Sequence, residues 1–347
     1  MPVLDPPVCL AECTTLRLGG PAARFVDAHD EAELLDEIRQ ADDNGEPLLV
    51  IGAGSNLVVA DAGFPGTVLR VAFRGIRWSS DGDRLLVDIA AGQVWDDVVT
   101  AAIAEGCAGL ECLSGIPGLA GATPVQNVGA YGAEIADVCV GVRVYDRLAR
   151  RVRWLAGSEC RFGYRHSILK NDDRYVVLTV RLSLRRSRLS TPIRYQQLAD
   201  ALGVPLGDCA PVDAVRNAVL ELRAAKGMLL DPGDPDTVSA GSFFTNPIVP
   251  DSQAPPEAPR FPAHAPGLVK IPAAWLIEQA GFAKGHRLDG VGISSKHALA
   301  LVNRGGSTAD LLELARRIRA AVQEKFGILL DVEPRLVGVR LHHHHHH

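Results

Sequence analysis

The sequence lacks long hydrophobic runs and clusters of positive charge. No segment approaches about 18 consecutive apolar residues, the length that a membrane-spanning helix requires. The N-terminal stretch MPVLDPPVCLAEC has neither the positive start nor the long apolar core of a signal peptide. The formal net charge is −5, and no run of Lys and Arg is interleaved with aromatic residues as in nucleic-acid-binding proteins. We therefore expect a cytoplasmic protein that binds neither membranes nor nucleic acid.

The seven cysteines form no CxxC pair and no regular framework of spacings. They are expected to be reduced and mostly structural, and no metal site is predicted. No internal repeat of roughly 20 to 50 residues is present, so the sequence does not predict a solenoid or a propeller. Residues 342–347 are an expression tag and take no part in the fold.

The composition is that of a globular protein. Hydrophobic residues make up 47% of the chain and charged residues 22%, so there is ample apolar surface to build a core. At about 340 residues without the tag, the chain exceeds what one hydrophobic core usually holds, which predicts two or three domains.

Helix and strand signals together predict a mixed α+β fold. Helices are predicted where a polar N-cap precedes an apolar stripe, as at Asp30 with Glu33 and at Ser307 with Asp310. Alternating apolar residues predict strands. The predicted helices cover residues 31–44, 94–105 and 307–326, and the predicted strands lie at 48–51, 85–89, 140–144, 178–184 and 328–339.

Two proline-rich stretches interrupt this pattern. Residues 230–236 read LDPGDPD, and residues 250–267 carry six prolines with little apolar content. Both are interpreted as connectors or surface excursions, and a third structural part is expected to begin near them. A joint between two earlier sheet-containing lobes is expected near Arg70.

A glycine-rich loop, IGAGSNLVVAD, follows the apolar residues 48–50. Gly52-Ala53-Gly54 resembles the start of a dinucleotide-binding fingerprint, but Leu57 stands where the third glycine belongs, and no helix signal follows it. Two interpretations stay open. The loop is an ordinary turn between strands, or its backbone N–H groups bind phosphate oxygens.

Residues 113–134, LSGIPGLAGATPVQNVGAYGAE, contain five glycines and two prolines but few charges. Each glycine costs conformational entropy, so this density indicates that the backbone approaches a bulky ligand closely. Together with the loop at 52–56, the stretch favours a large phosphate-bearing cofactor.

Three polar residues in apolar surroundings are candidates for chemistry: Arg165, Ser242 and Glu333. An arginine stabilises a developing oxyanion, a serine hydroxyl can donate a proton, and a carboxylate can orient that exchange. For each residue alone a structural role is the stronger alternative, because a buried Arg and Glu are more often an ion pair and a Ser beside Gly more often forms a turn.

Six motifs, in order, resemble the UDP-N-acetylenolpyruvoylglucosamine reductase (MurB) family, also called UDP-N-acetylmuramate dehydrogenases. The match spans nearly the whole chain, and six ordered motifs make a chance resemblance implausible. They are TTLRLGG at 14–20, GAGSNL at 52–57, IPGLAGATPVQNVGAYGAE at 116–134, GYRHS at 163–167, AGSFFTNP at 240–247 and IPAAWLIEQAG at 271–281.

The resemblance implies an α+β fold in which a two-lobe FAD-binding domain of the vanillyl-alcohol-oxidase/PCMH-like type is joined to a C-terminal α+β substrate-binding domain. It divides the chain into FAD-binding subdomain 1 (residues 1–70 with 331–341), FAD-binding subdomain 2 (71–228) and the substrate-binding domain (229–330). The implied reaction is the NADPH-driven reduction of UDP-N-acetylglucosamine enolpyruvate in bacterial peptidoglycan precursor synthesis. The cofactor is non-covalent FAD, NADPH is the co-substrate, and a monomer or weak oligomer is expected.

The resemblance also implies residue roles. Arg165 and Glu333 stabilise the enolate-like state, and Ser242 protonates it. Substrate contacts are implied for Tyr164, Tyr195, Lys226 and Asn246, whereas Thr14, where many members have Asn, receives no role. The implied FAD-binding residues are Gly52, Ala53, Gly54, Ser55, Asn56, Ser114, Ile116, Pro117, Gly118, Gly121, Gln126, Asn127, Gly129, Ala130, Tyr131 and Gly132.

Two other functions remain as alternatives at this point. One is a flavin-dependent oxidase that acts on a small alcohol with the same fold. The other is a catalytically silent module that binds a sugar nucleotide, which the presence of Arg165, Ser242 and Glu333 disfavours.

Overall fold

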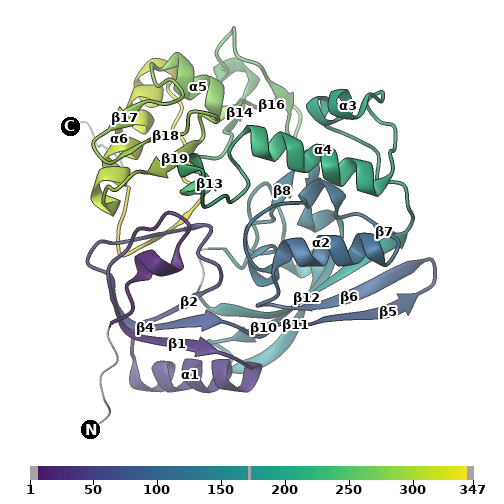
Figure 1. Cartoon of the computed structure of the whole chain (residues 1–347), viewed down its shortest axis with the longest axis vertical. Coiled ribbons are helices and arrows are strands. Elements are labelled where there is room, and N and C mark those ends of the chain that lie inside the picture. The colour runs from purple at the N-terminus through teal and green to yellow at the C-terminus, as the bar shows by residue number, and fades with distance from the viewer. Residues whose placement is uncertain (1–6, 171–172, 342–347) are drawn as a thin grey trace. The chain divides into compact units, whose positions relative to one another are not determined.

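The computed structural model of the chain (Figure 1) describes residues 7–170 and 173–341. The chain divides into two compact units. Unit 1 comprises Met1–Ala22, Gly54–Pro65 and Lys226–His347, and unit 2 comprises Ala23–Ala53 and Gly66–Ala225. The three-part division implied by the family resemblance stays a prediction.

Unit 2 is built on an antiparallel six-stranded sheet with the order β11-β10-β12-β6-β5, in which β7 also pairs with β12. A three-stranded sheet with the order β1-β4-β2 and a short hairpin, β8-β9, complete its strands. The bounds are β1 Ala22–Ala28, β2 Leu48–Ile51, β4 Phe64–Val71, β5 Ile76–Asp81, β6 Arg84–Ala90, β7 Cys107–Ala108, β8 Gly129–Ala130, β9 Ala133–Glu134, β10 Cys139–Asp146, β11 Arg151–Ala156 and β12 Tyr175–Arg186.

Four helices belong to unit 2: α1 (Glu31–Asn44), α2 (Trp95–Ala104), α3 (Gln196–Leu202) and α4 (Val212–Ala225). The predicted first helix is confirmed, because the Asp30 side chain accepts a hydrogen bond from the Glu33 amide (2.7 Å) and Gly45 ends the helix in the left-handed conformation. The predicted helix at 94–105 is confirmed as α2. Buried residues of α1, of α2 and of both sheets of unit 2 form one core. Figure 1 shows α1 alongside β1 and β4, and α2 alongside β6 and β12.

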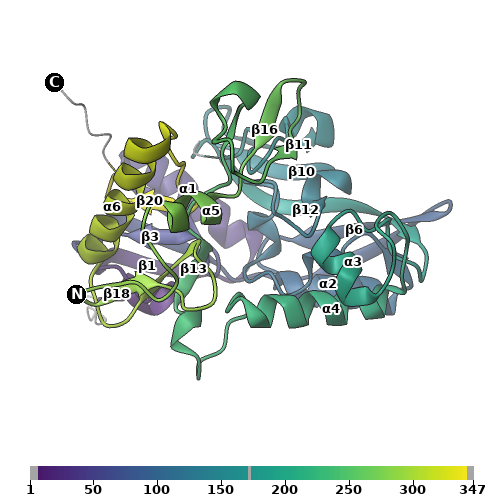
Figure 2. The same ribbon diagram turned by 90° about the horizontal axis from the view of Figure 1, so that it is seen from above.

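Unit 1 contains a four-stranded sheet with the order β13-β19-β18-β17, a three-stranded sheet with the order β14-β16-β15 and a parallel pair, β20-β3. Helices α5 (Ala273–Gln279) and α6 (Thr308–Phe326) share a core with the four-stranded sheet (Figure 2). The strand bounds are β3 Leu57–Val59, β13 Ser239–Ser242, β14 Ile248–Pro250, β15 Phe261–Pro262, β16 Leu268–Lys270, β17 Arg287–Leu288, β18 Val291–Ile293, β19 Ala300–Asn303 and β20 Arg335–Val337.

The start and end of α6 follow the sequence prediction. Ser307 and Asp310 each accept a hydrogen bond from the backbone N–H of the other, which makes a capping box, and Gly327 ends the helix in the left-handed conformation. This helix carries the apolar stripe predicted for residues 307–326, with Leu311, Ala315, Ile318 and Val322 buried.

Two strand predictions are corrected. Of the strand predicted at residues 328–339, only β20 forms. Val332 makes a single bridge with Phe244. The segment that follows Phe244 reaches Pro247, which has no backbone N–H and therefore cannot donate a hydrogen bond to extend this pairing. In β10 the predicted alternation fails at Val140, whose side chain is 44% exposed. The register shifts between Cys139 and Gly141, and this irregularity turns Val140 out of the buried row.

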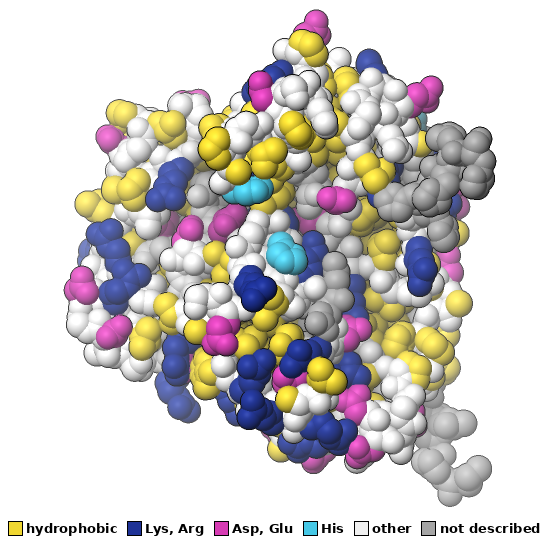
Figure 3. Space-filling view, turned by 180° about the vertical axis from the view of Figure 1, so that it is seen from behind, with side chains coloured by type: hydrophobic (Ala, Val, Ile, Leu, Met, Phe, Trp, Pro, Cys, Tyr) yellow, Lys and Arg dark blue, Asp and Glu magenta, His cyan; other side chains and the backbone are white. Residues whose placement is uncertain are grey.

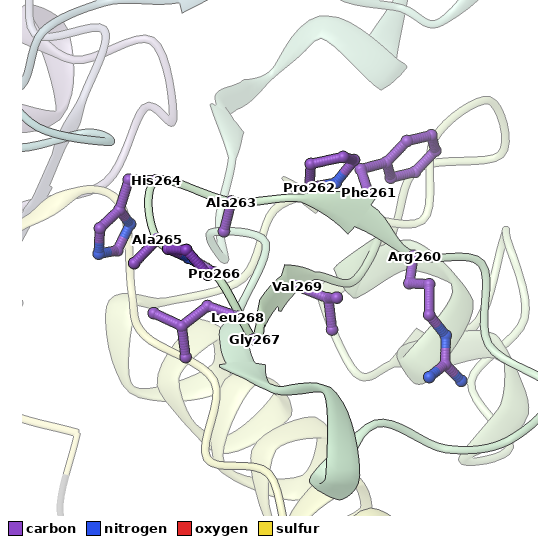
Figure 4. Close-up of a pocket in the computed structure, with 10 residues that line it drawn as sticks. All are labelled: Arg260, Phe261, Pro262, Ala263, His264, Ala265, Pro266, Gly267, Leu268 and Val269. Carbon is purple, nitrogen blue, oxygen red and sulfur yellow. The ribbon is translucent and has the colours of Figure 1, made fainter.

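The proline-rich excursion at 250–267 is partly ordered as a sheet. Its strand β15 pairs with β16, which in turn pairs with β14. The hairpin lines an open pocket of about 570 Å³ formed by residues 260–269. Figure 4 shows the ring of His264 at the turn between β15 and β16. None of the predicted site residues lines this pocket.

Several charged side chains of unit 2 form ion pairs. In unit 2 the buried carboxylate of Asp146 accepts two hydrogen bonds from Arg174 (2.8 and 2.9 Å) and others from the amides of Leu148 and Ala149. Arg174 is the main cause that lowers the pKa of Asp146 to about 2. Figure 3 shows basic and acidic side chains next to one another on the lower part of one face.

None of the seven cysteines, all of which lie in the described ranges, forms a disulfide, which agrees with the predicted reduced state. In residues 7–170 and 173–341, no helix combines the length and the hydrophobicity that crossing a membrane requires.

Candidate active site

The loop at residues 52–56 connects β2 to β3, and two of its carbonyl oxygens accept hydrogen bonds from other segments. Gly54 O accepts a hydrogen bond from the Thr15 amide, and Asn56 O accepts one from the Arg335 amide, both at 3.0 Å. Among the described residues, none of the amides of Gly52 and Ala53, in unit 2, or of Gly54 and Asn56, in unit 1, donates a hydrogen bond within the unit to which its residue belongs. These N–H groups suit an anion, so the loop fits a cofactor diphosphate.

Glycine is required at position 54 by both backbone conformation and space. Its φ is +67°, and a Cβ there would lie 1.9 Å from the carbonyl oxygen of Cys13. At Gly52 an added Cβ would instead meet the end of the Leu119 side chain at 3.0 Å, which a flexible side chain can relieve. The second glycine of the loop therefore tolerates no side chain, and the first is less constrained.

The second glycine-rich loop is attached to the start of α2. Trp95 donates its backbone N–H to Gly118 O (3.0 Å) and its indole N–H to Leu113 O (3.1 Å). The buried Ser114 hydroxyl donates to Glu111 O at 2.7 Å. The Ser114 hydroxyl therefore uses its proton within the loop. Its oxygen could contact the cofactor only as a hydrogen-bond acceptor.

Asp96 in α2 fixes this loop to α4, which lies beside α2 (Figure 2). Its carboxylate accepts the amide of Gly115 (2.7 Å) and two hydrogen bonds from Arg216 (2.7 and 2.8 Å). Burial of Asp96 opposes its ionisation, but the hydrogen bonds from Arg216 and Gly115 outweigh this effect, so the pKa of Asp96 is lowered.

Asn127 joins the third predicted cofactor segment to the turn that carries Arg165. Its side-chain amide donates to Gly163 O (2.8 Å) and to the Glu134 carboxylate (2.9 Å), and its Oδ1 accepts the amide of Ala136 (2.9 Å). The residue is fully buried and has a φ of +46°. All these bonds are internal, so Asn127 shapes the segment, and its side chain has little capacity left for a ligand.

Arg165 lies in a tight turn in which Gly163 and His166 exchange backbone hydrogen bonds (2.9 and 3.2 Å). Its φ is +49°, an uncommon conformation for a residue with a side chain. Its guanidinium donates to Gly129 O (2.9 Å) and lies 5.1 Å from the ring centre of Tyr164. The predicted oxyanion-stabilising residue is thus in contact with the predicted cofactor segment of unit 2.

Tyr131 and Gly132 are the central residues of the β8-β9 hairpin turn. Their φ values, +52° and +83°, are those of a type I′ turn, which favours Asn or Gly at the first position. Tyr131 packs edge-on against Tyr195, with ring centres 5.5 Å apart. Burial raises the pKa of Tyr131. A predicted cofactor residue and a predicted substrate residue are therefore in direct contact.

Ser242 and Glu333 lie on adjacent backbone segments of unit 1. Ser242 ends β13, and the next carbonyl, Phe243 O, accepts the amide of Glu333 at 2.8 Å. Phe244 and Val332 form a bridge beside it. Both Ser242 and Glu333 are half-buried. The structure thus brings the predicted proton donor and the predicted carboxylate together, although nothing in their sequence spacing indicated it.

The remaining predicted substrate residues have defined local surroundings. Asn246 accepts the amide of Ala273, the first residue of α5, at 2.8 Å. This bond joins the AGSFFTNP and IPAAWLIEQAG motifs. Lys226 directly follows α4 and precedes Gly227, whose φ is +66°. Arg165 belongs to unit 2, whereas Ser242, Glu333, Asn246 and Lys226 belong to unit 1.

Comparison with known proteins identifies the family of the chain. Residues 22–153 match the FAD binding domain model, and residues 234–337 match that of the UDP-N-acetylenolpyruvoylglucosamine reductase C-terminal domain. The UDP-N-acetylenolpyruvoylglucosamine reductase of Thermobifida fusca is 53% identical to the chain over 96% of its length and 98% of the relative's. The chain belongs to the UDP-N-acetylenolpyruvoylglucosamine reductase family. The Streptomyces coelicolor reductase is 51% identical, covering 96% of this chain and 90% of its own.

A solved member of the reductase family supports the same conclusion. The crystal structure of UDP-N-acetylenolpyruvylglucosamine reductase (MurB) from Thermus caldophilus matches with a TM-score of 0.65 and 29% identity, covering 95% of this chain and 97% of that one. With the FAD-binding and reductase C-terminal matches, this confirms the predicted fold class, a flavin-binding domain joined to a C-terminal α+β substrate domain.

Sequence reasoning missed several residues that hold the site segments in place. Asp96 and Arg216 are 120 residues apart, and neither stands in a recognisable motif. Thr14 received no role, but its buried hydroxyl bonds both the amide and the carbonyl of Leu18 (3.2 and 3.1 Å) and so closes its own turn. The TTLRLGG motif was the available signal for this turn.

Proposed function

We propose that this chain catalyses the NADPH-driven, FAD-dependent reduction of UDP-N-acetylglucosamine enolpyruvate to UDP-N-acetylmuramate in bacterial peptidoglycan precursor synthesis. The observation that carries the proposal is the match along nearly the whole chain to named reductases of this substrate. The presence of an FAD-binding domain supports the flavin dependence.

When bound, FAD would supply the hydride transfer that links NADPH to the methylene carbon of the enolpyruvyl group. The amides of Gly52, Ala53, Gly54 and Asn56 would bind its diphosphate, since they are not used inside their own units. The segments at 114–121 and 126–132 would complete the cofactor site. Their backbones are already fixed by the hydrogen bonds of Trp95, Asp96 and Asn127 described above, so little ordering is needed on binding.

Three side chains are assigned to the substrate chemistry. Negative charge that develops beside the reduced carbon spreads into the substrate carboxylate, and Arg165 and Glu333 stabilise this enolate-like state. Ser242 donates the proton that completes the reduction at the neighbouring carbon. The hydrogen bond between the Glu333 amide and Phe243 O supports a joint role for Ser242 and Glu333, because it holds their backbones in register.

Substrate binding is assigned to Tyr164, Tyr195, Lys226 and Asn246. Tyr195 is 40% exposed and precedes α3, which suits a residue that meets a ligand from solvent. The lysine ammonium suits a diphosphate as a point charge. We further propose a cytoplasmic monomer or weak oligomer that binds neither nucleic acid nor membranes.

The competing oxidase of a small alcohol is not favoured, since the relatives that match along the whole chain are named reductases. Anaerobic mixing tests the proposed function directly. NADPH should bleach the bound flavin, and UDP-N-acetylglucosamine enolpyruvate added afterwards should restore its absorbance with formation of UDP-N-acetylmuramate. A flavin that NADPH does not bleach would support the silent binding module instead, and flavin retained after denaturation would support the oxidase.

Glu333→Gln tests the carboxylate at the end of the chain. The substitution keeps the side-chain volume and the backbone hydrogen bond to Phe243 O, so fold, FAD content and reduction by NADPH should stay normal. Reoxidation by the enolpyruvyl substrate should slow by about 10- to 100-fold, because a charge that stabilises the transition state is lost. Stopped-flow absorbance of the flavin measures both steps.

The matched control is Glu324→Gln, which removes an exposed carboxylate from α6 of the same unit. It should leave both half-reactions unchanged. Normal reoxidation in Glu333→Gln would remove Glu333 from the mechanism.

A further inference from the structure

Thr15 is hydrogen-bonded to two segments of unit 1 that are far apart in the sequence. Its amide donates to Gly54 O (3.0 Å), in the loop assigned to the FAD diphosphate. Its hydroxyl donates to Ser239 O (2.7 Å), at the start of the strand that ends in Ser242, and lies 3.4 Å from Gly54 O. One residue thus connects the cofactor loop to the strand of the proposed proton donor.

The segment around Thr15 is itself fixed on both sides. Thr14 closes its turn onto Leu18, and the side-chain amide of Asn303, in β19, donates to Leu16 O at 2.9 Å. Gly54 approaches the Cys13 carbonyl so closely that a Cβ would not fit. Thr15 therefore cannot shift without moving its neighbours. A displacement of the loop at Gly54 would also displace the strand at Ser239.

The strand β13 depends on such a restraint. Its ladder partners in β19 are Val302 for Ser239 and Ala300 for Ser242, with a register shift between them, and backbone hydrogen bonds from Asn303 N–H to Val238 O (3.0 Å) and from Phe243 N–H to Leu299 O (2.8 Å) flank this irregular stretch. An irregular pair holds its strand less firmly than a continuous ladder. Ser242 follows Ser239 by only three residues, so a change in the position of Ser239 also changes the position of the Ser242 hydroxyl.

We propose that Thr15 is a positioning residue that sets the place of the Ser242 hydroxyl relative to the FAD-binding loop. The inference rests on the proposed function, in which Ser242 protonates the substrate. Thr15 contacts neither reacting atoms nor substrate in this scheme. Its effect falls on the step that uses Ser242, because a misplacement of about 1 Å can slow a reaction by roughly 100-fold.

The test compares Thr15→Val, which keeps the shape and the amide but lacks the hydroxyl, with Thr15→Ser, which keeps the hydroxyl. Thr15→Val should retain FAD and be reduced by NADPH within about twofold of normal. Its reoxidation by the enolpyruvyl substrate should fall by about 10- to 100-fold. Thr15→Ser should recover the rate to within about threefold. Loss of FAD from Thr15→Val, or normal reoxidation, would overturn the proposal.

A double-mutant cycle shows whether Thr15 acts through Ser242. In the Ser242→Ala background, Thr15→Val should cause little further slowing, because there is no hydroxyl left to misplace. Equal slowing with and without Ser242 would contradict the proposal while leaving the role of Ser242 intact. If Ser242→Ala itself reoxidises normally, the role of Ser242 fails, and so does a positioning role that acts through it.

Amide hydrogen exchange gives a readout independent of turnover. In FAD-free protein, Thr15→Val should raise the exchange rate of peptides covering residues 239–242 and 52–56 by at least about threefold. Thr308→Val is the matched control, since its buried hydroxyl also donates to a backbone carbonyl of unit 1, Val59 O (2.6 Å). It should leave both half-reactions and these peptides unchanged. Unaltered exchange at residues 239–242 in Thr15→Val would show that the hydrogen bond does not restrain the strand.

Discussion

Ser242→Ala is expected to slow reoxidation of the flavin by the enolpyruvyl substrate by about 10² to 10⁴, the usual loss when a positioned acid is removed. Reduction by NADPH needs no proton at the sugar carbon, so bleaching should keep nearly its normal rate. Substrate affinity should change little, because a hydroxyl that acts only in the transition state affects turnover more than binding. Rapid-mixing absorbance of each half-reaction, run anaerobically, measures the two rates separately.

Two further variants serve as controls for Ser242→Ala. Ser242→Cys should recover part of the rate, since a thiol can still donate a proton. Ser252→Ala, which truncates an exposed serine of the same unit, should behave as wild type. Reoxidation within a few-fold of normal in Ser242→Ala would exclude Ser242 as the acid. Equal slowing of both half-reactions would point to displaced flavin.

Gly54→Ala is expected to yield folded but largely colourless protein. The new Cβ would lie 1.9 Å from the Cys13 carbonyl oxygen, so the loop has to move by more than about 1 Å to reach an ordinary contact. If two amide–phosphate hydrogen bonds of about 1.5 kcal/mol each are lost, FAD affinity falls by roughly 100-fold. The ratio of flavin to protein absorbance and titration of the apoprotein with FAD measure the change.

Gly45→Ala is the control for the backbone conformation alone. Gly45 has nearly the same φ (+65° against +67°), but a Cβ added there would meet no atom within 4 Å. The substitution should cost about 1 kcal/mol of folding free energy and leave FAD binding intact. Stoichiometric FAD with normal affinity in Gly54→Ala would mean that the loop at 52–56 is only a turn between two strands.

The local structure was predictable where neighbouring residues decide it. The helix after Asp30 and the helix after Ser307 begin at side-chain caps and end at glycines in the left-handed conformation, and both signals are read within a few residues of sequence. The prediction failed at Val140, where a shift in strand pairing, invisible in the alternation of residues, exposes the side chain.

In the candidate site, too, the sequence predicted only what neighbouring residues decide. The density of glycine indicated loops that come close to a ligand, and the ordered motifs indicated the family, but the demand for glycine at position 54 comes from Cys13, 41 residues earlier in the chain. Asn127 was expected as a cofactor residue, and the structure shows its side chain engaged with Gly163 and Glu134. Its burial and its partners depend on how the loops pack, which no local pattern records.

The sequence by itself determined the family, the cofactor class and the capped helices, because these depend on residue types and on short spacings, and it proposed Arg165, Ser242 and Glu333 as the reactive side chains. Only the tertiary structure decided which of them meet. The contact between the Ser242 and Glu333 segments and the link from Thr15 to both Gly54 and Ser239 join residues that are tens to hundreds of positions apart. Such contacts form when separate strands and loops pack into one core, and the free energy of that packing is spread over the whole unit.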